Sequence, residues 1–125
     1  MAEFYLCRHC GNLAGMIHDA GVPMWCCNEK MEKLVPSTAE SGGEKHLPVV
    51  TVKDHTVSVN VGSVGHPMTP EHLIQWVYLQ TERGGQRKNL RPSDDPAVTF
   101  ALDGDKAVAV YAYCNLHGLW MTDLS

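Results

Sequence analysis

Polar and apolar residues alternate without a break along residues 56–61, where each of three valines follows a polar residue. A period of two residues is typical of a strand with one buried and one exposed face. Four other short stretches rich in β-branched and aromatic residues predict further strands: residues 47–52, 72–79, 98–102 and 106–113. Turn-forming residues separate them and no long segment has a helical period, so this part of the chain predicts an antiparallel β-sandwich.

The first 36 residues follow a different plan, because they carry four of the five cysteines. Cys7 and Cys10 form a C-x-x-C knuckle, and Cys26 and Cys27 are adjacent. So short a segment can hardly fold on its apolar surface alone, whereas four thiolates can close around a tetrahedral metal ion. A redox dithiol at Cys7 and Cys10 is the alternative, but it leaves the second pair without a role. His9, inside the knuckle, is expected to point outward.

Adjacent cysteines cannot wrap an ion as two C-x-x-C knuckles do, so we expect a distorted tetrahedron at this site. Zinc and iron both accept four thiolates, and the residues alone do not choose between them.

Composition bounds the classes of function. A 125-residue chain has room for one domain of about 90 residues and a small stapled module, and the segment 36–43, rich in small and polar residues, reads as the linker. We therefore expect domains at 1–36 and 37–125. With 44% hydrophobic and 19% charged residues the protein is globular, and a net charge of -4 without a basic run argues against a nucleic-acid partner. No apolar segment has the length of a membrane span, so a cytoplasmic location is expected, with no membrane partner.

A second cluster of possible metal ligands lies in the loops of the predicted sandwich. Cys114 and His117 follow its last predicted strand, His46 precedes its first, and His66 and His72 bracket a loop. A thiolate beside imidazoles suits iron, copper or zinc better than magnesium or calcium. Each residue taken singly has a simpler interpretation, such as a buried cysteine or a surface histidine.

Four motifs in this region resemble those of the superoxide reductases: EKHLPV at 44–49, VGSVGHPM at 61–68, EHLIQW at 71–76 and CNLHGLW at 114–120. The cysteines of the first 36 residues are similar to the desulforedoxin-type module of the two-iron members, the desulfoferrodoxins. The resemblance covers nearly the whole chain, with the motifs in the same order.

The resemblance implies an immunoglobulin-like sandwich and two iron centres. The first iron would be held by four thiolates: Cys7, Cys10, Cys26 and Cys27. The second would have four imidazoles in a plane, a thiolate below it and one open position, with these ligands: His46, His66, His72, His117 and Cys114.

The implied activity is the one-electron reduction of superoxide to hydrogen peroxide, with electrons from a rubredoxin-like donor. Lys45 would attract the anion and guide a proton to it. The resemblance makes Glu44 the group that takes the sixth position of ferric iron and assists peroxide release. It also favours a homodimer. Trp120 is expected to pack the closing loop and need not touch the chemistry.

Two functions of other classes stay open from the residues alone. One is an electron carrier in which both irons shuttle charge and no substrate binds. The other is an interaction module stapled by zinc, which would be colourless.

Overall fold

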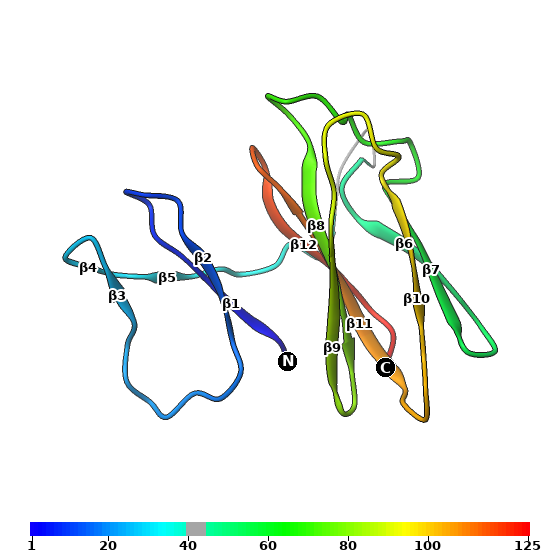
Figure 1. Ribbon diagram of the computed structural model, residues 1–125, viewed down its shortest axis with the longest axis horizontal. Coiled ribbons are helices and arrows are strands. Elements are labelled where there is room, and N and C mark those ends of the chain that lie inside the picture. Colours follow the sequence, from blue (N-terminus) through cyan, green and yellow to red (C-terminus); the bar gives the residue numbers. More distant parts are fainter. Residues whose placement is uncertain (40–44) are drawn as a thin grey trace. The chain divides into compact units, whose positions relative to one another are not determined.

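The computed structural model describes residues 1–39 and 45–125, and all regular elements in these ranges are strands (Figure 1). The chain divides into two compact units, Met1–Val35 and Pro36–Ser125. The all-β prediction is confirmed. No helix of the described ranges is long and apolar enough to cross a membrane.

The first unit is built around one central strand. Strand β1, Glu3–Leu6, pairs antiparallel with β2, Leu13–Met16, and with β5, Glu32–Lys33. Strands β3, Trp25–Cys26, and β4, Glu29–Lys30, have two residues each and form a separate hairpin.

The apolar core of the first unit is small. Phe4 and Leu6 project from alternate positions of β1 and are buried, as is Cys7 just after it. Burial of so few apolar side chains gives little stability, which agrees with a unit held by a metal ion.

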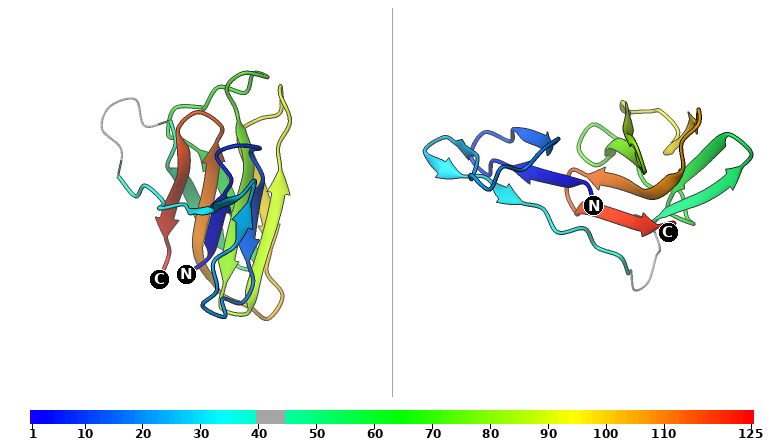
Figure 2. Two further views of the ribbon diagram at one scale, coloured as in Figure 1. Left: turned by 90° about the vertical axis from the view of Figure 1, so that its left-hand side faces the viewer. Right: turned by 90° about the horizontal axis from the view of Figure 1, so that it is seen from below.

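The second unit is a sandwich of two antiparallel sheets with strand orders β10-β7-β6 and β12-β11-β8-β9. Its strands are β6 Pro48–Lys53, β7 Thr56–Val61, β8 Ile74–Thr81, β9 Gly84–Asn89, β10 Ala97–Ala101, β11 Ala107–Cys114 and β12 Gly118–Asp123. Figure 2 shows β6 with β7 and β11 with β12 as two hairpins. The five strands expected from the sequence lie within two residues of their predicted bounds, while β9 and β12 were not predicted.

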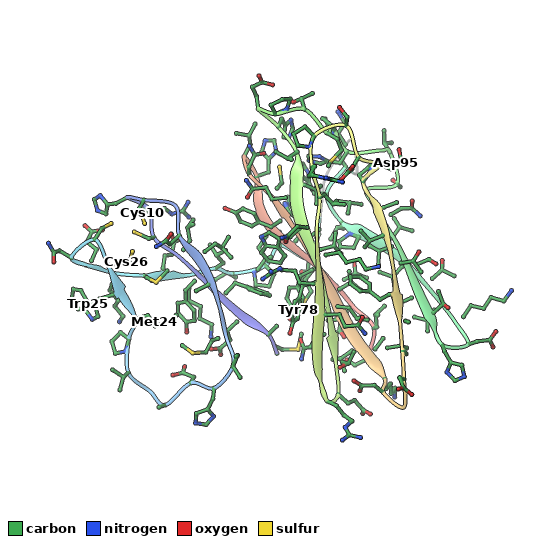
Figure 3. All side chains as sticks on the ribbon, in the orientation of Figure 1. Cys10, Met24, Trp25, Cys26, Tyr78 and Asp95 are labelled. Carbon is green, nitrogen blue, oxygen red and sulfur yellow. The ribbon has the colours of Figure 1, made fainter. Side chains whose placement is uncertain are left out.

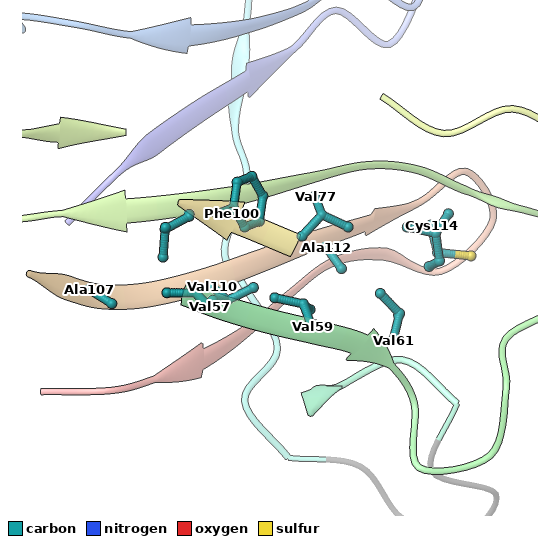
Figure 4. Close-up of a cluster of buried hydrophobic side chains, with 11 residues drawn as sticks. Val57, Val59, Val61, Val77, Phe100, Ala107, Val110, Ala112 and Cys114 are labelled. Carbon is teal, nitrogen blue, oxygen red and sulfur yellow. The ribbon is translucent and has the colours of Figure 1, made fainter. Parts of the chain in front are cut away.

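The core of the sandwich lies between the two sheets (Figure 4). The alternation of β7 turns Val57, Val59 and Val61 inward, where at most 1% of each is exposed. Phe100 and Val110 are fully buried in the same cluster. Each such side chain stabilises the fold by about 1.5–3 kcal/mol, so this unit has the rigid core that the first one lacks.

The register of the strands brings three segments to one end of the sandwich: the segment before β6, the loop between β7 and β8, and the loop between β11 and β12. Pro48, the first residue of β6, pairs with Val61, the last of β7. Cys114, the last residue of β11, pairs with Ile74 at the start of β8 and with Gly118 at the start of β12. The loops that carry the candidate histidines are therefore neighbours although they are far apart in the sequence.

Candidate metal centres

The first candidate centre consists of the sulfur atoms of Cys7, Cys10, Cys26 and Cys27, which all lie within 4.8 Å of one another. The Sγ atoms of Cys10 and Cys26 are 3.5 Å apart, and those of Cys26 and Cys27 are 4.0 Å apart. Thiolates bonded at about 2.3 Å to a tetrahedral ion are roughly 3.8 Å apart, so the site has the size of a metal tetrathiolate. Figure 3 shows Cys10 and Cys26 close together, beside the exposed Trp25.

Two tight turns create this site. After β1 the Cys7 carbonyl accepts a 2.9 Å bond from the Gly11 amide, which closes the C-x-x-C knuckle. In the second turn Cys27 and Asn28 have φ angles of 53° and 60°. The left-handed backbone at Cys27 changes the direction of the chain between neighbours, which is how two adjacent cysteines both reach the centre.

Backbone amides prepare the first centre for thiolates. The amides of Cys10 and His9 lower the pKa of Cys7 to about 6. Hydrogen bonds to the sulfurs of Cys10, Cys7 and Cys26 raise the pKa of Cys27 to about 12. A metal ion displaces such shared protons, and amide donors then stabilise the bound thiolates. The His9 ring is exposed and lies 2.9 Å from the Glu29 carboxylate, in agreement with the expectation that it points outward.

The second candidate centre is a closed ring of four imidazoles at the loop end of the sandwich. Neighbouring ring centroids are 4.9 Å apart for His46 and His66, 4.7 Å for His66 and His72, 5.1 Å for His72 and His117, and 4.8 Å for His117 and His46. Every neighbouring pair is edge-to-face, with interplanar angles from 67° to 80°. The four imidazoles therefore surround one common space.

Their donor atoms have the spacing of ligands. His46 Nε2 and His117 Nδ1 are 3.0 Å apart, which is also the distance of about 3 Å between two nitrogens bound at right angles to one first-row metal ion. The Cys114 Sγ lies 3.7 Å from the same His117 nitrogen. The donor atoms of His46, His72, Cys114 and His117 all lie within 4.8 Å of one another.

His66 completes the ring, although its donor atom is not in that 4.8 Å group. Its Nδ1 donates a 2.7 Å hydrogen bond to the Pro67 carbonyl, so Nε2 keeps its lone pair. The Nε2 atoms of His66 and His72 are buried and have no hydrogen-bond partner within the described part of the chain. Burial lowers the pKa of both imidazoles and keeps them neutral, as a metal ligand must be. A metal ion satisfies both nitrogens, and this donor set suits iron, as does the tetrathiolate.

The two faces of the ring formed by the four imidazoles differ. Cys114 is fully buried and belongs to the hydrophobic core, so its thiolate approaches from inside the sandwich. His117 and Lys45 are exposed on the solvent side. The Lys45 ammonium adds to the lowering of the His72 pKa, after burial and the other imidazoles, which places a positive charge near the ring. Glu44 belongs to residues 40–44, outside the described part of the chain.

Trp120 makes contacts with His46 and His117 that were not predicted from the sequence. Its indole stacks on the His46 ring at 4.7 Å and 14°, and its Nε1 donates a 3.1 Å bond to the His117 carbonyl. Trp120 therefore touches two candidate ligands, in addition to the expected packing of the closing loop. Its place three residues after His117 was the available signal.

Comparison with known proteins agrees with these two sites. The desulfoferrodoxin family profile matches residues 38–123. The desulfoferrodoxin of Nitratidesulfovibrio vulgaris is 40% identical over 121 residues, covering 97% of this chain and 95% of that protein. The superoxide reductase of Pyrococcus horikoshii is 34% identical and covers 73% of this chain and 97% of its own length.

A solved structure extends the likeness to the whole fold. The crystal structure of the superoxide reductase from Treponema pallidum superposes with a TM-score of 0.85 at 41% identity, covering 98% of both chains. The fold, the two donor sets and these relatives together establish that the chain belongs to the desulfoferrodoxin family.

Proposed function

We propose that this protein is a superoxide reductase that converts superoxide, one electron and two protons to hydrogen peroxide. The observation that carries the proposal is the ring of four imidazoles. Two of its buried Nε2 atoms have no partner in the described ranges, and the buried Cys114 thiol lies 3.7 Å from the His117 nitrogen. The reaction itself is inferred from relatives that are named superoxide reductases.

The proposed ligands of the catalytic iron are His46, His66, His72, His117 and Cys114. A ferrous ion bound there supplies the electron for superoxide reduction. Because its four imidazole ligands are neutral and the single thiolate is negative, the loaded site has a net charge of about +1, which attracts an anion.

Lys45 is the proposed residue for anion attraction and proton delivery. It is exposed, and its charge acts on His72, so an approaching superoxide meets a positive local field although the whole chain has a net charge of -4. A lysine can pass a proton directly or through one water. We assign Glu44, next to Lys45, to the release of peroxide after turnover.

The first centre is proposed to hold a second iron on Cys7, Cys10, Cys26 and Cys27. We assign residues 1–36 to a desulforedoxin-like domain and 37–125 to the catalytic domain, which agrees with the two compact units.

The cellular setting completes the proposal. We place the protein in the cytoplasm, as a homodimer that takes electrons from a rubredoxin-like donor. Exposed sheet edges on a small sandwich favour pairing of two chains. The net negative charge supports the absence of a nucleic-acid partner.

Metal analysis with visible spectroscopy tests the proposal. We expect two irons per chain, a ferric-tetrathiolate spectrum, and a separate thiolate-to-iron band that appears on oxidation and disappears on reduction. Zinc in a colourless protein would instead support an interaction module. Two irons without consumption of superoxide would support an electron carrier.

A further inference from the structure

Asn115, directly after the buried Cys114, makes three hydrogen bonds to the loop that carries His72. Its backbone N–H donates to the Leu73 carbonyl at 3.2 Å. Its side-chain Oδ1 accepts from the Leu73 amide at 3.0 Å, and its Nδ2 donates to the Glu71 carbonyl at 2.9 Å. The side chain thus binds the backbone on both sides of His72.

The hydrogen bonds of Asn115 lie at a point where the pairing of β11 with β8 does not fix the position of His72. Tyr113 pairs with Trp76 but Cys114 pairs with Ile74, so the ladder skips Gln75. A shift of this kind releases the strand from the regular ladder and can redirect the side chains next to it. The backbone before β8 therefore needs another attachment to β11.

A second set of hydrogen bonds lies within the loop itself. The backbones of Thr69 and His72 exchange hydrogen bonds of 2.9 and 3.2 Å, and the Thr69 hydroxyl adds to this turn. These bonds shape the loop but do not connect it to the strand that carries Cys114. Asn115 makes that connection.

We infer that Asn115 is a positioning residue that holds the His72 imidazole in register with the Cys114 thiolate. The inference rests on the proposed iron site. The asparagine amide offers a donor and an acceptor on two separate atoms, so it can bind two backbone groups at once, whereas aspartate offers acceptors alone and alanine offers neither. Residues that orient metal ligands typically change metal affinity by about 10–100-fold when they are replaced.

The test compares Asn115→Ala and the isosteric Asn115→Asp with the wild type, all loaded with ferrous iron without oxygen. Transfer of iron to a chelator is followed, and the tetrathiolate iron of the same chain serves as an internal reference. We expect both variants to lose the second iron about 10–100-fold faster, with unchanged release from the first centre. When iron-loaded samples are then oxidised, we expect the thiolate-to-iron band of both variants to be shifted. Asn89→Ala, on the exposed strand β9, is the matched control and should behave as wild type.

The outcomes separate the two claims. If the wild type takes up no iron at the second centre, the proposed function fails. If it does, and both variants keep the band and hold iron as long as wild type, the inference on Asn115 is wrong. A purely structural role would lower the unfolding temperature and leave the band of the remaining iron-loaded protein unchanged, which would also overturn it.

Discussion

His66 and His72 each bury an Nε2 atom without a hydrogen-bond partner in the described residues. Leaving a buried polar atom unpaired costs about 1–3 kcal/mol. Burial also lowers the pKa of both rings, so they stay neutral and offer lone pairs. A bound metal ion removes the cost and uses the lone pairs, so the residues that are unfavourable in the empty fold are those that make the site bind.

Trp120 offers a direct test at this scale. Trp120→Ala removes the stack on His46 and the bond to the His117 carbonyl, while Trp120→Phe keeps a ring and loses the donor. We expect Trp120→Ala to weaken Co²⁺ binding at the second centre about 10–100-fold, and Trp120→Phe to have a smaller effect. The thiolate-to-cobalt absorption measures this binding. Trp25→Ala, an exposed tryptophan of the first unit, is the control, and equal affinity in Trp120→Ala would contradict the assignment.

Lys45 is tested through rate and salt dependence. Lys45→Ala removes the positive charge near His72, so we expect the reaction with superoxide to slow about tenfold at low ionic strength and to depend less on salt. Pulse radiolysis measures the rate. Lys45→Arg should retain most of the attraction, and Lys53→Ala, at the other end of β6, should change nothing. A wild-type rate in Lys45→Ala would remove this residue from the mechanism.

Among the elements, the loop after β7 has one position that only glycine fits. Gly62 has a φ of 81°, and a Cβ there would lie 2.5 Å from the Lys45 and Val64 carbonyl oxygens. Its amide also donates to the Leu47 carbonyl at 3.0 Å. Gly62 therefore lets the segment before β6 approach the segment after β7, which brings His46 beside His66.

Gly62→Ala should destabilise the protein through both strain and collision. The control is Gly104→Ala, which has a positive φ of 60° but no atom within 4 Å of the added Cβ. Left-handed backbone alone costs about 1–2 kcal/mol for alanine, so we expect that loss for Gly104→Ala and about 3 kcal/mol or more for Gly62→Ala. Urea unfolding of the iron-loaded protein measures the difference. Equal losses would show that the approach of Lys45 is not restrictive.

The elements also explain which strands could be predicted. Strand β7 alternates because one of its faces is buried, and the sequence pattern predicts both of its ends correctly. Strand β9, with the sequence GGQRKN, is exposed at all six positions and lies at a sheet edge, so it carries no apolar signal. It pairs with β8 along its whole length, and the Tyr78 ring of β8 lies over Gly85, a contact with a glycine that composition does not reveal.

The candidate site was predictable to the extent that its chemistry is carried by residue type. Cysteines and histidines in recognisable motifs mark both centres. Trp120 and Asn115 were not predicted because their roles depend on cross-strand register: Trp120 pairs with Ala112, and Asn115 reaches the loop before β8. Gly62 was not predicted because a close approach of two backbones leaves no trace in the sequence pattern.

On the scale of the whole molecule, two compact units carry one centre each. Cys26→Ser removes one sulfur of the first centre, whose Sγ lies 3.5 Å from that of Cys10. We expect the tetrathiolate spectrum and one iron to be lost, because three sulfurs no longer close the tetrahedron, while the second iron and its thiolate band remain. Iron analysis and the oxidised spectrum measure this. Loss of both irons would show that the centres are not independent.

We expect the imidazole and thiolate site to reduce superoxide rather than to dismutate it. The most direct measurement is the product balance when the reduced Cys26→Ser protein, which should keep only the second centre, meets limiting superoxide. A superoxide reductase yields one hydrogen peroxide for each superoxide consumed and no dioxygen, with one iron oxidised each time, and this is the result we expect. Half as much peroxide together with dioxygen, or no consumption of superoxide, would contradict it.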